Sequence, residues 1–382
     1  MQKRPATAKR SARRAKMDNV RRMVIKVGTA TITEESGRLS PERVKALATQ
    51  VFAAREKGID VALVSSGAIA AGVERLGLEA RPMDVETLQA VAAVGQGVLV
   101  RIYTDLFAAG GITVGQVLLT QHDITHRQQY LNARHTLERL FEMGVVPIVN
   151  ENDTVATEEI TFGDNDMLAA LVASLVGADL LVLLTDTGGL FTEDPRMNES
   201  AELIKHVERV TDEIADLGGA AGDMGLGGMS SKILAAKAAS STGVNTVIAD
   251  GRVATTITDI LAGEEPGTFF KASGKVASKK HWIGYARISK GRLRVDEGAA
   301  RAILERGKSL LPAGVVAVEG EFDVGDCVDI LGPDGKLIAR GLASYDSREA
   351  AGVMGLRSEE ILEELGEKGE EMVHRDELTV LD

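Results

Sequence analysis

Six runs of apolar residues, separated by stretches with helical spacing, follow one another over the first 270 residues. They predict β-strands at residues 23–27, 59–64, 112–119, 145–150, 180–185 and 244–249. Each run is nearly continuous in apolar side chains, which is typical of parallel strands covered on both faces. Helical spacing predicts helices over residues 41–57 and 229–242. Residues 22–270 therefore read as an α/β domain with a mainly parallel sheet sandwiched by helices.

The pattern changes after residue 270. Residues 271–284 begin with small, polar and basic side chains and are predicted to be a linker. Strand-like pieces follow at 291–299 and 314–341, where Asp334-Gly335 is a strong hairpin signal between two apolar runs. The acidic residues 359–371 predict a solvated helix face, and a final strand is expected near 378–381. We predict a second, small and mostly β domain over residues 285–382.

Charge is spread unevenly along this chain of 382 residues. Residues 1–17 carry seven Lys or Arg and no acid, although the formal net charge is −12. We predict a basic, disordered tail over residues 1–21, without the apolar core of a secretory signal. The acidic remainder argues against general nucleic-acid affinity, so any polyphosphate must be met by local lysines and backbone amides.

The number of cysteines and the lengths of the apolar runs indicate the cellular compartment of the protein. The one cysteine, Cys327, excludes an internal disulfide, fits a reducing compartment and is expected to be a small buried side chain. No uninterrupted apolar run reaches the roughly 18 to 20 residues of a membrane span. A cytoplasmic protein that does not enter membranes is expected.

Polar residues stand at the carboxyl ends of the predicted strands, where open parallel sheets bind their ligands. They occur in the segments Lys26–Thr29, Ser65–Ala68, Asn150–Asp153 and Thr185-Asp186. A further polar group, Gly163–Asp166, precedes a predicted helix, and a capping role for Asp164 is an equal alternative to a binding role. For Asn152, Asp153, Asn165 and Asp166 as a group, binding is the better interpretation.

Two lysines suggest contact with phosphate. Lys26 interrupts an apolar strand, where an unpaired ammonium would be costly to bury, so it either reaches solvent at the strand end or meets a phosphate across Gly28. The segment "GLGGMSSK" (225–232) does not fit the P-loop pattern, because both serines precede its lysine. Backbone amides at the start of the following helix, the two serines and Lys232 would still form a binding site for a transferred phosphoryl group.

Nine segments together resemble the glutamate 5-kinases of the amino acid kinase superfamily over residues 22–382. They read "VIKVGT", "VSSGAIAAG", "VAAVGQ", "LNARHTL", "VPIVNENDTVAT", "FGDNDMLAA", "LLTDTGGLFTEDPR", "GGMSSK" and "VDEGAARAILERGKSLLP". The resemblance implies the amino acid kinase fold followed by a PUA domain, a small pseudo-barrel also found in RNA-modifying enzymes. It implies phosphorylation of the side-chain carboxylate of L-glutamate by ATP, the first step of proline biosynthesis.

The resemblance also assigns roles to residues. Lys26 would contact the ATP phosphates, and Asp166 would orient Lys26 and Lys232. Ser66, Asp153 and Asn165 would bind glutamate. The nucleotide would be held by Thr185, Asp186, Leu226, Gly227, Gly228, Met229, Ser230, Ser231 and Lys232. Two positions depart from the family pattern, since threonine is usual at position 226 and frequent at 231, so a side-chain contact from Leu226 is in doubt.

Further expectations follow from the same resemblance. They are Mg²⁺ with ATP, L-proline as feedback inhibitor, a homo-oligomer (dimer or tetramer), and contact with the reductase that uses the acyl phosphate. Two alternatives remain open at this point. One is another carboxylate or phosphate kinase of the same fold, such as an acetylglutamate or aspartate kinase. The other is an RNA-binding protein with a vestigial kinase, against which the acidic second domain argues.

Overall fold

The chain divides into two compact units, Met1–Lys275 and Val276–Asp382, which are described separately. The computed structural model describes residues 17–34, 36–120, 123–124, 127–155, 165–198, 200–218, 228–273, 289–356, 361 and 371–381. Residues 1–16 of the predicted tail, 274–284 of the predicted linker and most of the acidic stretch 359–371 lie outside these ranges.

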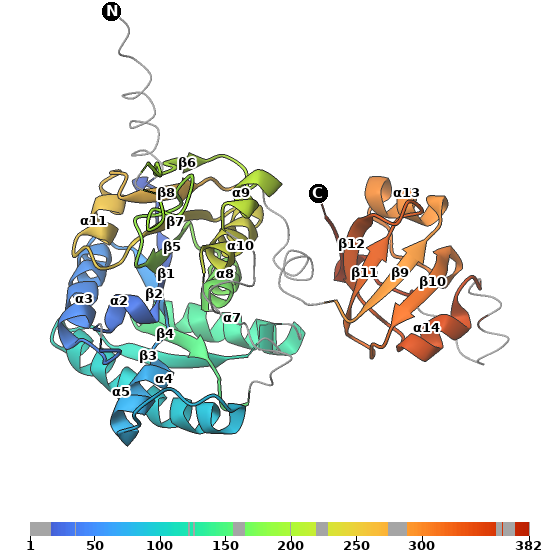
Figure 1. Ribbon diagram of the computed structural model, residues 1–382. Coiled ribbons are helices and arrows are strands. Elements are labelled where there is room, and N and C mark those ends of the chain that lie inside the picture. Colours follow the sequence, from blue (N-terminus) through green and yellow to red (C-terminus); the bar gives the residue numbers. More distant parts are fainter. Residues whose placement is uncertain are drawn as a thin grey trace, which may run out of the picture. The chain divides into compact units, whose positions relative to one another are not determined.

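An eight-stranded sheet forms the centre of the first unit, in the order β3-β4-β2-β1-β5-β7-β8-β6 (Figure 1). The strands are β1 (Arg22–Val27), β2 (Asp60–Ser65), β3 (Val114–Leu119), β4 (Val146–Glu151), β5 (Leu180–Thr185), β6 (His206–Val207), β7 (Asn245–Asp250) and β8 (Gly267–Phe270). All neighbours pair in parallel except β7 and β8. The six predicted strands and the mainly parallel sheet are confirmed, while β6 and β8 were not predicted.

Helices cover both faces of this sheet (Figure 1). They are α2 (Thr29–Ile32), α3 (Pro41–Glu56), α4 (Ala68–Leu76), α5 (Val85–Ala108), α7 (Arg127–Glu142), α8 (Asn165–Leu175), α9 (Asp212–Asp216), α10 (Met229–Ser241) and α11 (Thr256–Leu261). Buried side chains of α3, α5 and α11 share one core cluster with Met23, Ile25 and Val27 of β1. Because side chains alternate along a strand, Lys26 points to the opposite face, toward α8.

Helix α5 is long and apolar enough to cross a membrane by length and composition alone. Of its apolar 18-residue stretch, 33% is buried within the protein. No other described helix passes this test. Leu99, Tyr103 and Phe107 on its inner side are fully or almost fully buried in the core cluster shared with α3 and the sheet. The inner side of this helix is therefore part of the core of the first unit.

The predicted end of the disordered tail, residue 21, lies too far along the chain. Met17 and Val20 are 4% and 9% exposed and belong to the core cluster of the first unit. The backbone N–H of Val20 donates to the carbonyl of Met17 at 3.2 Å, forming a turn that leads into β1. These two apolar residues follow the basic run directly, so the ordered chain begins at least five residues before β1.

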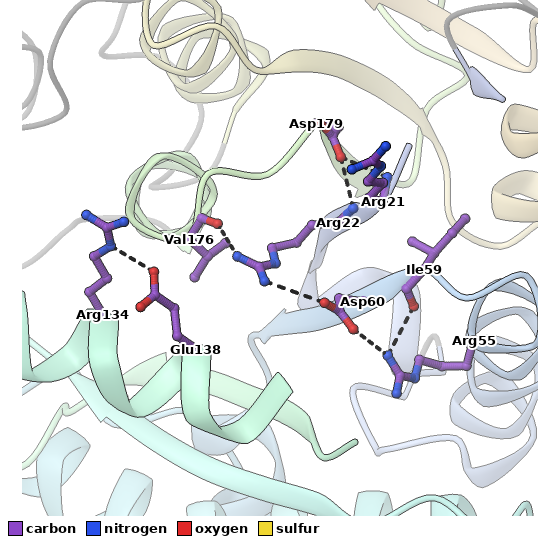
Figure 2. Close-up of polar contacts among 9 residues, drawn as sticks. All are labelled: Arg21, Arg22, Arg55, Ile59, Asp60, Arg134, Glu138, Val176 and Asp179. Carbon is purple, nitrogen blue, oxygen red and sulfur yellow. Dashed lines mark hydrogen bonds and ion pairs between the residues drawn. The ribbon is translucent and has the colours of Figure 1, made fainter. Parts of the chain in front are cut away.

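A polar network ties together the starting ends of β1, β2 and β5 (Figure 2). Asp179 accepts hydrogen bonds from the backbone N–H groups of Arg21 and Arg22 at 2.8 and 3.0 Å. The Arg22 guanidinium donates to the carbonyl of Val176 at 2.5 Å and pairs with Asp60 at 3.5 Å. Arg55 of α3 pairs with the same Asp60 at 2.8 Å. Two arginine side chains thus share Asp60, while backbone N–H groups hold Asp179 at this amino-terminal edge.

The second unit contains a five-stranded sheet in the order β10-β9-β11-β12-β13. Its elements are β9 (Gly291–Val295), α13 (Glu297–Arg306), η2 (Pro312–Gly314), β10 (Val315–Gly320), β11 (Cys327–Leu331), β12 (Leu337–Leu342), α14 (Ser347–Val353), η3 (Arg375–Glu377) and β13 (Leu378–Val380). The β11–β12 hairpin turns at Asp334-Gly335 as predicted, with Gly335 at φ 78°. Cys327 is buried, also as predicted.

One strand boundary in the second unit was wrong. The piece 291–299 was expected to be strand-like throughout, but β9 ends at Val295. The Asp296 side chain accepts a hydrogen bond from the Ala299 N–H at 2.7 Å and caps α13. The cap satisfies an otherwise free amide and starts the helix immediately after the strand.

Candidate active site

Two buried lysines share one buried carboxylate at the carboxyl edge of the main sheet. Lys26 Nζ lies 2.6 Å from Asp166 Oδ1, and Lys232 Nζ lies 3.0 Å from Asp166 Oδ2. The three side chains are only 4%, 7% and 0% exposed for Lys26, Lys232 and Asp166. Ion pairing offsets much of the cost of burying these charges. Two ammonium groups held side by side make the site suited to an anion.

The first turn of α10 completes this lysine cluster. Ser231 Oγ lies 3.0 Å from Asp166 Oδ2 and 2.8 Å from the carbonyl oxygen of Gly228, and its one hydroxyl hydrogen is within reach of both acceptors. Gly228 is the N-cap of α10 and has no side chain to cap the helix, so the amides that begin the helix depend on other partners. Met229 and Ser230 lie in the same turn. Leu226 and Gly227 lie outside the described residues, so the departure from threonine at 226 has no structural account.

Gly28 leaves room beside the Lys26 ammonium. Its φ of −71° is open to any residue, so backbone conformation does not require glycine there. A Cβ at this position would stand 3.7 Å from Lys26 Nζ and 3.4 Å from the carbonyl oxygen of Leu184. A larger side chain would fill the space next to the ammonium. The missing side chain thus fits close approach of a phosphate to Lys26.

A cavity of about 1150 Å³ opens on the acceptor side of the cluster. Ser66, Asp153 and Asn165, the three residues predicted to bind glutamate, all line it. Asn152 is absent from the lining; its side-chain Oδ1 instead accepts from the Thr154 hydroxyl at 2.6 Å, a local turn contact. Because Asn165 and Asp166 are consecutive residues of α8, the cavity and the lysine cluster meet at the start of this helix.

Amide side chains organise the floor of the cavity. Asn165 Nδ2 donates to Ser66 Oγ at 3.0 Å and to Asn150 Oδ1 at 2.9 Å. Asn150 Nδ2 in turn donates to Gln96 Oε1 on α5 at 3.0 Å. Sequence reasoning placed Asn150 at a strand end without a role and did not single out Gln96, because no local pattern shows that α5 reaches this strand. The chain of bonds fixes which face of each amide points at Ser66.

The Asp153 carboxyl is partly buried at the mouth of the cavity. Burial raises its pKa above the ordinary value, while its own backbone N–H and the charge of Arg81 act in the opposite direction. Arg81 also lines the cavity and was not predicted. A carboxylate in this position is suited to binding an ammonium group, provided that it is ionised.

Thr185 is the last residue of β5 and Asp186 follows it, next to the strand that carries Lys26. The Thr185 hydroxyl donates to Asp186 Oδ1 at 3.2 Å. Arg252 donates to the Asp186 carbonyl at 2.5 Å and pairs with Asp250 at 2.7 Å. The segment is therefore held in place beside the lysine cluster, as the predicted nucleotide site requires. Among the residues that the structure describes, no group of His, Cys, Asp or Glu side chains could hold a metal ion.

Comparison with known proteins identifies the family. Residues 21–250 match the amino acid kinase family. Glutamate 5-kinase from Moorella thermoacetica is 50% identical over 371 residues, which cover 96% of this chain and 98% of that protein. The chain belongs to the glutamate 5-kinase family. Glutamate 5-kinase from Myxococcus xanthus is 47% identical over 97% of this chain and 99% of that protein.

The glutamate 5-kinase family assignment covers both units. Residues 291–365 match the PUA domain, which corresponds to most of the second unit. The predicted fold class, an amino acid kinase fold followed by a small PUA-like domain, is thus confirmed. The lysine cluster and the cavity both lie in the part that matches the kinase family.

Proposed function

We propose that this chain transfers the γ-phosphoryl group of ATP to the side-chain carboxylate of L-glutamate, forming L-glutamyl 5-phosphate, the first step of proline biosynthesis. The observation that carries the proposal is the pair of buried lysines on Asp166 beside a cavity lined by Asn165 and Ser66. The relatives named glutamate 5-kinase, aligned over nearly the whole chain, support the choice of acceptor.

The reaction needs charge neutralisation rather than a base. The side-chain carboxyl of glutamate has a reference pKa of about 4.3, so the nucleophile is already ionised near neutral pH. One carboxylate oxygen forms a bond to the γ-phosphorus, while the bond from that phosphorus to the bridging oxygen breaks and ADP leaves with the electron pair. Lys26 and Lys232 would lie against the transferring group and stabilise its negative charge. Asp166 would hold both ammoniums in position.

The cavity residues suit the acceptor. Asp153 would pair with the α-ammonium of glutamate, and Ser66 and Asn165 would bind its polar groups. Thr185, Asp186 and the segment 226–232 would hold the nucleotide. Mg²⁺ would enter as part of the Mg·ATP substrate, because phosphate oxygens and water supply most of the ligands of this ion in such sites.

An acyl-phosphate assay tests the function. ATP and glutamate are supplied with hydroxylamine, which traps the acyl phosphate as a hydroxamate. Aspartate and N-acetylglutamate serve as competing acceptors, and omission of Mg²⁺ tests the metal requirement. Product with glutamate and little with the other two acceptors is expected. A preference for either alternative acceptor would assign the chain to a different carboxylate kinase.

We also propose that L-proline inhibits by competing at the glutamate cavity. The predicted sensor, residues 153–162, follows the substrate residues directly, although only 153–155 of it lie within the described residues. Substitutions in this segment should weaken inhibition while most activity remains. Inhibition curves with proline at several glutamate concentrations test this, and insensitivity of the unmodified chain would refute it.

Assembly and location complete the proposal. We expect a cytoplasmic homo-oligomer, either a dimer or a tetramer. We also expect it to contact the reductase that consumes the acyl phosphate. The PUA-like unit is expected not to bind nucleic acid. Light scattering gives the oligomeric state, and a monomer would refute it. Hydroxylamine trapping in the presence of the reductase tests contact, since direct transfer lowers the trapped fraction. A salt titration of RNA binding tests the last point.

A further inference from the structure

Helix α5 packs directly against the turn that leads from β2 into α4. A Cβ on Gly95 would stand 1.7 Å from the carbonyl oxygen of Ala68, and one on Gly72 would stand 2.0 Å from the carbonyl oxygen of Val91. Both distances are far below any real Cβ contact, so the two helices touch through their backbones at these glycines. The beginning of α4, which lines the cavity, therefore has α5 as its support.

Tyr103 of α5 adds a polar contact to this support. Its side chain is 0% exposed, and its hydroxyl lies 2.8 Å from the hydroxyl of Ser65, which is also 0% exposed. Ser65 Oγ donates to the carbonyl of Ser66 at 3.0 Å. Because that bond uses the one hydroxyl hydrogen of Ser65, Tyr103 must be the donor toward Ser65. Burial raises the pKa of Tyr103 to about 12, so its proton stays in place at ordinary assay pH.

The Tyr103–Ser65 contact leads to the substrate residues. Asn165 Nδ2 donates to the carbonyl of Ser65 at 3.2 Å and to the hydroxyl of Ser66 at 3.0 Å. Gly67 then adopts φ 103°, a left-handed conformation that favours glycine, and α4 begins at Ala68. A shift of Ser65 would move the partners of Asn165 and the start of α4 together.

We propose that Tyr103 is a positioning residue for the acceptor substrate: its hydroxyl fixes the Ser65–Gly67 turn that presents Ser66 to the cavity. This inference rests on the proposed function, because it takes glutamate as the ligand of that cavity. It concerns the hydroxyl and not the ring, since the ring packs edge-to-face with Phe107 at a centroid distance of 6.1 Å independently of any hydrogen bond.

The test is Tyr103→Phe, which keeps the ring and removes only the hydroxyl. Glutamate KM should rise by roughly three- to tenfold, the size of effect that one buried hydrogen bond produces, with ATP KM and kcat nearly unchanged. Phe107→Leu is the matched control, because Phe107 is equally buried on the same helix and lies within the aromatic cluster. It should lower the melting temperature and leave glutamate KM unchanged.

A double substitution distinguishes loss of the Tyr103–Ser65 hydrogen bond from a nonspecific loss of stability. Ser65→Ala alone should also raise glutamate KM, and adding Tyr103→Phe to it should have little further effect, because the contact is already lost. Fully multiplicative effects would overturn the proposal, as would an unchanged glutamate KM in Tyr103→Phe. An unmodified chain without glutamate kinase activity would instead refute the proposed function, and this inference with it.

Discussion

Strand β1 carries one cation near each end, Arg22 and Lys26. The surroundings of these two side chains differ. At the amino-terminal edge, the side chains of Arg22 and Arg55 share Asp60, while Asp179 accepts from the backbone N–H groups of Arg21 and Arg22, as Figure 2 shows. The Arg22 guanidinium also lies 4.5 Å from the ring centroid of Phe141 and bonds the Val176 carbonyl. The two terminal nitrogens of Arg22 thus both have partners within the protein.

At the carboxyl edge, the Lys26 side chain is almost fully buried, 4% exposed against 26% for Arg22. Two lysines share the single carboxylate of Asp166, and Gly28 leaves space beside one of them. The comparison teaches that a shared carboxylate does not distinguish a structural cation from one proposed to act on a substrate. Deep burial next to open space does, and lysine's compact, mobile ammonium suits such a place better than arginine's rigid fork.

Lys232→Ala is the strongest test of a catalytic role for the carboxyl edge. We expect kcat to fall by about a hundredfold or more while glutamate KM changes little, because the interaction strengthens as charge moves in the transition state. Lys237→Ala, on the same helix, is the matched control and should retain kcat. Steady-state kinetics with both substrates make the measurement, and a near-normal kcat in Lys232→Ala would remove this residue from the mechanism.

Asp153→Asn tests the acceptor side of the carboxyl edge. Glutamate KM should rise by roughly ten- to a hundredfold, since an ion pair with the ammonium is lost, while ATP KM stays nearly constant. A rise in ATP KM instead would mean that the two subsites are reversed.

The pH dependence sharpens the assignment of Asp153. Burial raises the pKa of Asp153, so kcat/KM for glutamate should fall with decreasing pH as this carboxylate and the substrate's own side chain both take up protons. Two protonations give log(kcat/KM) a limiting acid slope of about two, and the Asp153→Asn variant should reduce it to about one. Equal slopes would exclude Asp153 as the titrating group.

Removal of the second unit tests whether the carboxyl edge is complete within the first. A chain ending after Ser273 keeps the whole sheet and the contact from the Ser273 N–H to the Ser240 carbonyl at 2.9 Å. Its kcat should lie within about tenfold of full length, a barrier change of up to about 1.4 kcal/mol. A folded but inactive truncation, judged by circular dichroism and gel filtration, would place part of the site in the PUA-like unit.

Arg22→Lys at the amino-terminal edge should have the smallest effect on activity. It keeps the charge but loses the planar fork and the stacking on Phe141, so the free energy of unfolding should fall by about 1–2 kcal/mol. We expect kcat and both KM values to stay within about twofold of wild type, because no contact of Arg22 reaches the cavity. Thermal unfolding and kinetics on one preparation measure both, and a large loss of kcat would contradict a purely structural role.

Much of the first unit could be predicted because its signals are local. Six apolar runs marked six strands, and polar residues at their ends marked Lys26, Ser66 and Thr185. Strand β6 has only two residues and no periodicity to detect, and the antiparallel direction of β8 depends on its pairing with β7. Neither property is written in a short window of sequence.

The predicted site residues were those at strand ends and in recognisable motifs. The structure confirms the ion pairs of Asp166 with both lysines and the common cavity of Ser66, Asp153 and Asn165. Their assigned roles stay predictions. Gln96 and Tyr103 escaped notice because they lie inside an apolar helix, where a polar residue looks like ordinary core or surface. Only the packing of α5 against β2 and β4 reveals their partners.

Asn165 and Asp166 are joined by one peptide bond, and this adjacency fixes the distance between their Cα atoms. Asn165 lines the cavity and Asp166 pairs with the lysines, and their Cα atoms are about 3.8 Å apart. No hinge can lie between two neighbouring residues of one helix. In the proposed reaction, the backbone positions that carry the cavity and the lysine cluster would therefore keep one fixed spacing during any closure around them.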